Sequence, residues 1–212
     1  KPMGSLCPEI SVVVPVYKSA ATLIELTERI DATLTALHIT YEIILSDDDS
    51  PDNTWQVIEL LCKDNSHIKG LKLATNSGQW KNTLAGISQA AGDYIVTIDD
   101  DLEYAPEDIA KLYRLITTEN YKVVFGIAAD KYVKQKKFPR ISKLRKRILE
   151  LFWKTALADS FKIFHRDVVF SSNKFLPDIL LQAFLTHHVN RKFWGYVNVV
   201  FNKRPSGLSN HT

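Results

Sequence analysis

Residues 94–101 read YIVTIDDD, an apolar, β-branched run that ends in three consecutive aspartates. Two earlier stretches have the same form: ISVVVPVY (residues 10–17) and YEIILSDDDS (residues 41–50). Apolar runs of this length are typical of strands buried on both faces of a sheet. The sequence therefore predicts a central sheet whose strands end in polar or acidic residues.

Helical patterns separate these strands. In the first, apolar residues recur at spacings of three and four: Leu23, Leu26, Ile30, Leu34 and Leu37. Ser50 is the predicted N-cap of the second helix, with Pro51 at its first position. Three further helices are predicted at residues 79–91, 148–157 and 176–189, and another begins at Pro106. Further strands are predicted at residues 68–74, 121–125, 160–164 and 196–201. Alternation through about residue 126 predicts an α/β fold, a three-layer α/β/α sandwich with a mostly parallel sheet.

The length and composition fit a globular domain. The chain has 212 residues, of which 45% are hydrophobic and 24% charged, and these values exclude a disordered or collagen-like chain. Residues 1–5 (KPMGS) look like a remnant of cloning, and we expect residues 6–212 to form one domain. Two cysteines, Cys7 and Cys62, cannot build a disulfide framework, which favours a reducing compartment.

The mild net charge of +3 hides an asymmetry. Residues 131–147 contain nine of the 27 basic residues and no acidic one, which leaves 18 basic against 24 acidic residues elsewhere, a net charge of −6. Apolar residues interleave the cations through residue 157, as in an amphipathic segment at a membrane surface. A solvated helix face is the alternative. We expect no nucleic acid partner, because the rest of the chain is acidic and carries no base-reading motif.

The aspartate clusters are the strongest chemical feature. In an open α/β sheet, ligands bind at the carboxyl ends of the strands, where Asp47–Asp49 and Asp99–Asp101 are predicted to lie. A solvated loop or a helix cap explains one such cluster. Two clusters at one sheet edge repel each other electrostatically, which favours a bound cation between them. Mg²⁺ or Mn²⁺ together with a diphosphate fits such oxygen ligands. In extended backbone Asp99 and Asp101 share a face, with Asp100 turned elsewhere.

Other catalytic motifs are absent from the sequence. Gly78 stands alone after Asn76-Ser77, so no glycine-rich phosphate loop is indicated. No G-x-S-x-G nucleophile elbow occurs, and the histidines show no zinc-ligand spacing with an acidic partner.

At these residues the sequence resembles the family-2 glycosyltransferases of the GT-A (Rossmann-like) fold, and among them the polyprenyl-phosphate branch. The similar segments are ISVVVPVYKSAATL, YEIILSDDDSPDNTW, NSGQWKNTLAGISQAAGDYIVTIDDDLEYAPEDI and RPSGLSNHT. The combination with its spacing is specific, whereas no single segment is.

The resemblance implies a role for each matching position. The nucleotide would be held by Pro15, Tyr17, Asp47, Asp48 and Asp100, with Gly78 and Gln79 beneath the nucleotide-sugar. Asp99 and Asp101 are the D-x-D pair of metal ligands, and Asp101 also counts as catalytic because it would bridge metal and diphosphate. Asp159 is the acidic position near the reacting centre. Arg204, Gly207 and Ser209 would close over the diphosphate or the acceptor phosphate.

The chain also departs from the family pattern. Asp49 replaces a glycine, Glu103 stands where glutamine is frequent, and Thr75 replaces an arginine. The fifth strand ends in Gly126-Ile-Ala128, without an arginine that would meet the acceptor phosphate, and Arg140 or Arg145 are candidates to substitute.

The expected function is therefore inverting, metal-dependent transfer of a sugar from a nucleotide diphosphate, favoured as UDP, to a polyprenyl phosphate or a glycan in cell-envelope synthesis. Residues 6–126 would bind the nucleotide-sugar and residues 127–212 the acceptor. We expect a cytoplasmic location at the inner face of the membrane, with peripheral contact through residues 131–147. A degenerate domain that binds nucleotide-sugar or membrane without turnover is the alternative. A nucleotide-sugar pyrophosphorylase is disfavoured, since no glycine-rich loop follows Val16.

Overall fold

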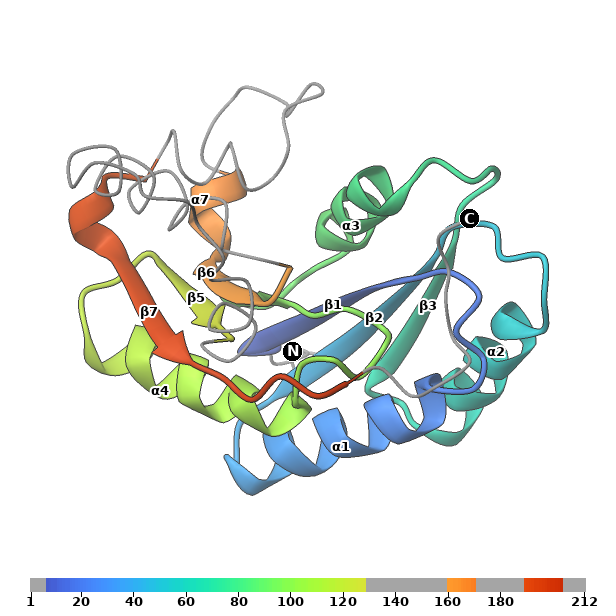
Figure 1. Ribbon diagram of the computed structural model, residues 1–212, viewed down its shortest axis with the longest axis horizontal. Coiled ribbons are helices and arrows are strands. Elements are labelled where there is room, and N and C mark those ends of the chain that lie inside the picture. Colours follow the sequence, from blue (N-terminus) through green and yellow to red (C-terminus); the bar gives the residue numbers. More distant parts are fainter. Residues whose placement is uncertain (1–6, 129–159, 171–188, 204–212) are drawn as a thin grey trace, which may run out of the picture.

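The computed structural model describes residues 7–128, 160–170 and 189–203 (Figure 1). Several predictions fall outside these ranges. They are the cloning remnant at residues 1–5, the basic segment with the helix after it (residues 131–157), most of the predicted helix 176–189, Asp159, and Arg204 with the tail that follows it.

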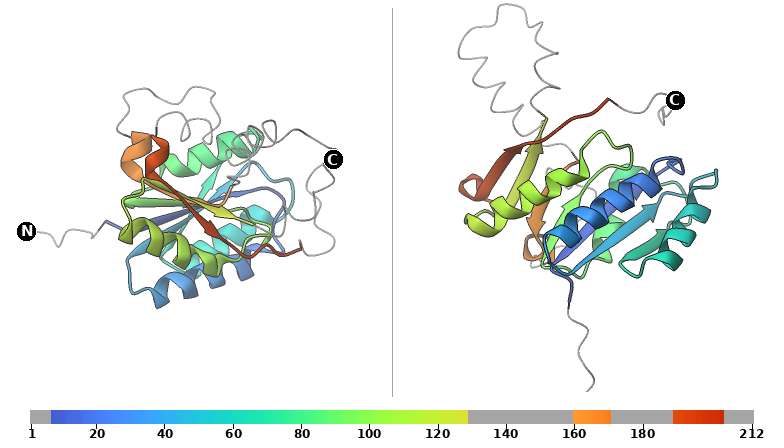
Figure 2. Two further views of the ribbon diagram at one scale, coloured as in Figure 1. Left: turned by 60° about the vertical axis from the view of Figure 1, so that its left-hand side comes forward. Right: turned by 90° about the horizontal axis from the view of Figure 1, so that it is seen from below.

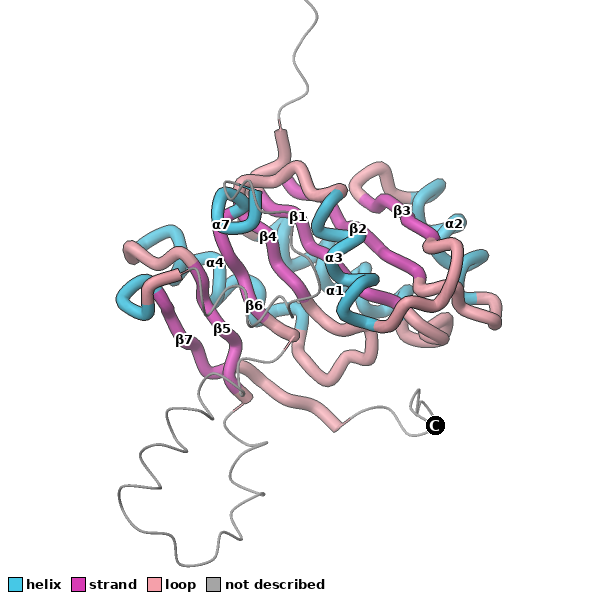
Figure 3. Tube along the Cα trace, turned by 90° about the horizontal axis from the view of Figure 1, so that it is seen from above, coloured by secondary structure: helices cyan, strands magenta, loops and turns pink. Residues whose placement is uncertain are grey.

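The described residues form a seven-stranded sheet in the order β3-β2-β1-β4-β6-β5-β7, seen strand by strand in Figure 3. The strands are β1 (Ile10–Val16), β2 (Tyr41–Asp47), β3 (Ile68–Lys72), β4 (Tyr94–Thr97), β5 (Val123–Ile127), β6 (Lys162–His165) and β7 (Trp194–Asn198). β1 to β4 pair in parallel, as do β5 and β7, whereas β6 is antiparallel to both of its neighbours, β4 and β5. The predicted mostly parallel sheet is confirmed.

Helices cover both faces of this sheet. They are α1 (Leu23–Ala36), α2 (Thr54–Asp64), α3 (Gln79–Ser88), α4 (Ile109–Thr118) and α7 (Arg166–Phe170), with 3-10 turns η1 (Pro106–Asp108) and η2 (Arg191–Phe193). α1, α2 and α4 lie against one face, and α3 and α7 lie against the other (Figure 2). The three-layer α/β/α arrangement is thus the predicted one. Within the described ranges, no helix combines the length and apolar character needed to cross a membrane.

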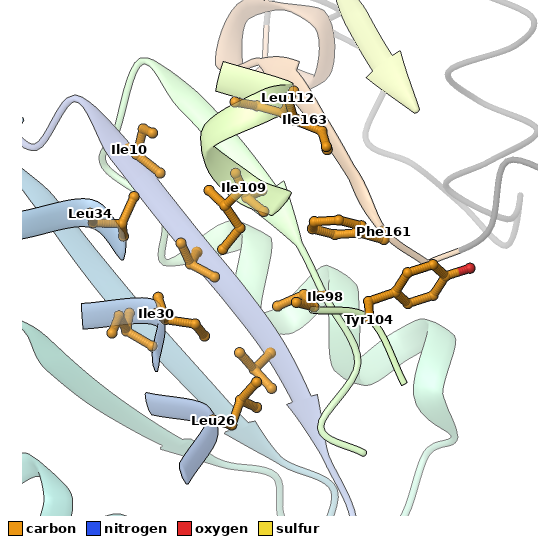
Figure 4. Close-up of a cluster of buried hydrophobic side chains, with 14 of the residues drawn as sticks. Ile10, Leu26, Ile30, Leu34, Ile98, Tyr104, Ile109, Leu112, Phe161 and Ile163 are labelled. Atoms are coloured by element: carbon orange, nitrogen blue, oxygen red, sulfur yellow. The ribbon is translucent and has the colours of Figure 1, made fainter. Parts of the chain in front are cut away.

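The alternation of side chains along β1 explains why both layers form. Val12, Val14 and Val16 belong to the cluster beneath α1 and α4, part of which Figure 4 shows, whereas Val13 belongs to the cluster beneath α3. All four are fully buried. Gly86 lets α3 approach the sheet closely, since a Cβ there would lie 2.5 Å from Val13 Cγ1. This close contact places α3 directly against β1.

Some predicted boundaries were wrong. Ser50 is not the N-cap of α2, which begins at Thr54 with Asn53 at its cap. The Ser50 hydroxyl instead donates to the carboxylate of Asp47 and accepts from the backbone N–H of Lys18. A local capping rule is overridden here because the nearby Asp47 and the distant Lys18 both bind this hydroxyl. β3, α3 and β7 also end a few residues earlier than predicted.

Candidate active site

A cleft of about 380 Å³ opens at the carboxyl ends of β1 and β4. The order of the strands changes direction at β1, because β2 and β3 lie on one side of it and β4 lies on the other. Such a switch point is where open α/β sheets bind ligands. The cleft walls are Pro15 to Tyr17 at the end of β1, Asp48 after β2, Asp99 to Asp101 with Glu103 after β4, and residues between Asn76 and Asn82 at the start of α3.

Asp48 holds the loop that leads into α3. Its two carboxylate oxygens accept from the backbone N–H groups of Ser77 at 2.7 Å and Gly78 at 2.8 Å. Asp48 is 2% exposed, whereas the two residues that donate to it are exposed. Gly78 has a φ of +86°, a conformation that side chains with a Cβ rarely adopt. Asp48 and Gly78 together fix the start of α3 over the end of β2.

Asp47, the neighbouring aspartate at the end of β2, lies outside this cleft. It is fully buried and accepts from the backbone N–H and the hydroxyl of Ser50. Burial raises the pKa of the Asp47 carboxyl, against the lowering effect of the bonds from Ser50. Its predicted contact with the nucleotide stays a prediction, and the contacts seen here are with the protein.

Asp100 joins the loop after β1 to the loop after β4. Its carboxylate accepts from the backbone N–H of Tyr17 at 3.0 Å and from the hydroxyl of Ser19, and its carbonyl accepts from the Thr22 hydroxyl at 2.7 Å. Burial raises the pKa of Asp100 to about 6, and the neighbouring charge of Asp101 adds to the rise. Asp100 therefore holds Tyr17, the predicted nucleotide-binding aromatic residue, against the D-x-D segment.

Asp99 and Asp101 have different surroundings. Asp99 accepts from Gln79 Nε2 at 2.6 Å and from the hydroxyl of Ser160, which lies two residues before β6. Asp101 is 8% exposed and accepts from the backbone N–H of Glu103 at 3.0 Å. The two aspartates of the D-x-D pair thus lie in one cleft, with Gln79 beside Asp99.

The charge of the cleft limits what can bind there. Five carboxylates line it, from Asp48, Asp99, Asp100, Asp101 and Glu103, and no lysine or arginine lines its described walls. An anionic diphosphate would be repelled unless a cation came with it. In the described part of the chain, no three His, Cys, Asp or Glu side chains are grouped to hold a metal ion by themselves. Such a site fits Mg²⁺ or Mn²⁺, which bind through one or two carboxylates plus phosphate oxygens.

Two residues of the site were missed by the sequence reasoning. Asn82 lines the cleft at 1% exposure and donates to the carbonyl of Ser46 at 2.7 Å, while its own carbonyl oxygen has no hydrogen-bond partner among the described residues. The sequence feature that could have indicated Asn82 is its position as a polar residue one turn after Gly78 in a helix of small residues. Ser160 carried no signal beyond its place at the start of a short predicted strand.

The predicted site residues thus separate into three groups. Pro15, Tyr17, Gly78 and Gln79 line one cleft together with Asp48, Asp99, Asp100 and Asp101. Asp47 lies buried behind it. Asp159 and Arg204 lie outside the described residues, so their predicted catalytic roles stay predictions.

The fold defines the class of protein. The structure resembles glucosyl-3-phosphoglycerate synthase of Mycobacterium tuberculosis, solved with Mn²⁺, UDP and phosphoglyceric acid, at a TM-score of 0.67 and 19% identity, covering 93% of this chain and 72% of that one. It also resembles a mannosyltransferase of Pyrobaculum calidifontis in complex with GDP-Man and Mn²⁺, at a TM-score of 0.66 and 13% identity, covering 96% of this chain and 59% of that one. At these identities the likeness establishes the GT-A fold and nothing finer.

The family follows from the sequence itself. The model of glycosyl transferase family 2 matches residues 11–172, and the chain belongs to that family. The undecaprenyl-phosphate 4-deoxy-4-formamido-L-arabinose transferase of Yersinia pestis is 38% identical over 124 residues, which are 58% of this chain and 38% of that protein. The Yersinia pseudotuberculosis protein of the same name matches equally well. The aligned part thus spans well under half of these relatives.

Proposed function

We propose that this chain is the catalytic domain of an inverting, metal-dependent glycosyltransferase. It would move a sugar from a nucleoside diphosphate, UDP being the first candidate, to a polyprenyl phosphate. The observation that carries the proposal is the cleft at the strand switch point. It unites the D-x-D carboxylates, Tyr17 and the loop fixed by Asp48, and the charged residues of its described lining are all acidic.

The chain's own residues would divide the work by position. Tyr17 would contact the base, and the loop at Gly78 and Gln79 would lie under the sugar and diphosphate. Asp101 and Asp99 would hold a Mg²⁺ or Mn²⁺ ion, which supplies positive charge to the leaving diphosphate. The acceptor oxygen attacks the anomeric carbon, the bond from that carbon to the diphosphate oxygen breaks, and the nucleoside diphosphate leaves with both bonding electrons. Arg204 would add a second positive charge at the diphosphate.

The acceptor determines whether a base is needed. The Yersinia relatives are named as undecaprenyl-phosphate transferases, which supports a lipid phosphate acceptor. Such a phosphate is already anionic and needs no strong base. A glycan hydroxyl, the second acceptor class, must lose its proton to a carboxylate, for which Asp159 is the candidate. Asp159→Asn should then abolish turnover and leave nucleotide affinity nearly unchanged. Normal turnover in that variant would remove Asp159 as the base.

A lipid acceptor also implies contact with a membrane. We propose that residues 131–147, with nine cations and no acidic residue, bind the anionic inner face of the cytoplasmic membrane. Co-sedimentation of the protein with vesicles tests this. Binding to phosphatidylglycerol vesicles that weakens at high salt is expected, and equal binding to neutral phosphatidylcholine vesicles would contradict it.

A thermal-shift panel of UDP, GDP, CDP and dTDP, each with Mn²⁺ and again with EDTA, tests the donor site. Ligand at about 100 times its dissociation constant adds about 2.7 kcal/mol of stability, which raises the melting temperature by several degrees. A Mn²⁺-dependent shift with one nucleotide is expected. No shift with any nucleotide would contradict the proposal. A shift with no hydrolysis or transfer of the matching sugar would instead favour a degenerate binding domain.

A further inference from the structure

We propose that Ser160 is a positioning residue for the metal end of the cleft, acting by fixing the carboxylate of Asp99. The inference rests on the proposed function, since it takes the D-x-D pair as the metal site. Ser160 lies 61 positions from Asp99 in the sequence, on the segment that leads into β6, the neighbour of β4 in the sheet.

Asp99 is held from two sides by neutral donors. Gln79 on α3 donates to its Oδ1, and the hydroxyl of Ser160 donates to its Oδ2. Rotation of a carboxylate about its last torsion is soft, so two donors on opposite oxygens define its plane. Neither donor brings charge, so the cleft keeps the negative potential that attracts a divalent ion.

Ser160 is itself rigidly placed. Its carbonyl accepts from the hydroxyl of Thr97, which is 2% exposed and ends β4. The next residue, Phe161, is fully buried, and its carbonyl accepts from the backbone N–H of Gly126 at 3.0 Å. The Phe161 ring lies 5.2 Å from that of Tyr104, and Figure 4 shows the two side by side. The Ser160 hydroxyl therefore reaches Asp99 from a fixed backbone.

This arrangement makes Ser160 an outer-sphere partner of the metal site. Partners that orient a ligating carboxylate change metal affinity by about 10- to 100-fold when they are removed. The same bond ties the strand that follows Asp159 to the donor side of the cleft. We therefore expect loss of the hydroxyl to weaken the metal site and to lower kcat more than it raises KM for the nucleotide-sugar.

Isothermal titration of Mn²⁺ into the protein in the presence of excess UDP tests the inference without relying on turnover. Ser160→Ala should raise the dissociation constant for Mn²⁺ about tenfold, and Ser160→Thr, which keeps a hydroxyl, should restore most of the affinity. Ser88→Ala is the matched control, because Ser88 is exposed on α3 and its hydroxyl donates to Ala85 in the same helix. It should bind Mn²⁺ as the unmodified protein does.

Each outcome has a defined meaning. If the unmodified protein shows no Mn²⁺-dependent UDP binding, the proposed function itself fails. If the unmodified protein binds and Ser160→Ala binds equally well, the positioning role is overturned, even when the variant melts at a lower temperature. Ser160→Cys, of similar size and with only a weak donor, replaces the alanine variant if that one does not fold, and the same tenfold loss is expected.

Discussion

The carboxylate of Asp48 accepts a hydrogen bond from the backbone N–H of Gly78 at 2.8 Å, which joins the end of β2 to the start of α3. The loop between them has little else to hold it, since residues 74–79 are all exposed. This single carboxylate therefore shapes one wall of the proposed donor site.

Asp48→Asn should weaken UDP binding about tenfold, equivalent to about 1.4 kcal/mol. An asparagine side chain has one acceptor oxygen, and its NH₂ group would face a backbone N–H in place of the second. Calorimetry of UDP with Mn²⁺ measures the change. Asp49→Asn is the control, because Asp49 is exposed and asparagine tolerates its φ of +56°. Equal affinities of the two variants would contradict the role given to Asp48.

Gly78→Ala should lower the free energy of unfolding by about 1–3 kcal/mol, because a Cβ is strained at a φ of +86° and a ψ of 153°. Apart from its two chain neighbours, no described residue has a heavy atom within 4 Å of the added Cβ, so the loss comes from the backbone conformation. Gly78→Ser should therefore cost about as much as Gly78→Ala in urea unfolding. A serine variant much less stable than the alanine one would point to a steric cause and against this account.

Asp108→Ala should release the chain after β7. The Asp108 carboxylate is nearly buried, accepts from the backbone N–H of Val200, and pairs with Lys111 at 2.6 Å. The backbone N–H of Asn202 in turn donates to the carbonyl of Glu103 at 2.7 Å, beside the D-x-D segment. Amide exchange at Val200 should speed up at least tenfold, as loss of a bond to a charged group implies. Lys111→Ala removes only the half-exposed partner and should leave this amide protected.

Glu42 should make stability depend on pH. Burial disfavours its charged form, but hydrogen bonds from Lys69 at 2.6 Å, from the Ser11 hydroxyl and from the Ala91 backbone N–H outweigh burial and lower the pKa of Glu42. A lowered folded-state pKa gives stability that is present above the unfolded value of about 4.3 and is lost as pH falls through the folded value.

Glu42→Gln should therefore cost about 2 kcal/mol at pH 7, and the difference from the unmodified protein should shrink as pH falls below about 4. Denaturant unfolding between pH 7 and pH 3 measures both. Lys69→Met removes only the partly exposed cation and should cost less. A difference that is constant over this pH range would show that the glutamate charge is not the source of the stability.

The strands could be predicted because their signal is local. β1 and β2 are buried at every position, and their sequences are mostly apolar runs that can be recognised without knowing their partners. The boundary at Ser50 could not be predicted, since its hydroxyl is taken by Asp47 and Lys18, and Lys18 lies 32 positions away. A capping rule considers only neighbours in sequence, so it cannot take the hydrogen bond from Lys18 into account.

The aspartates show the limit of what the sequence alone predicts about the site. By itself it determined the alternation of strands and helices, the carboxyl-end position of both acidic clusters, and hence the edge of the sheet that carries the site, because these follow from burial and chain order. Only the tertiary structure decided what each carboxylate contacts. Asp48 meets Ser77, Asp100 meets Tyr17, and Asp99 meets Ser160, across 29, 83 and 61 positions. Such pairings depend on how loops from separate strands converge, which no local pattern records.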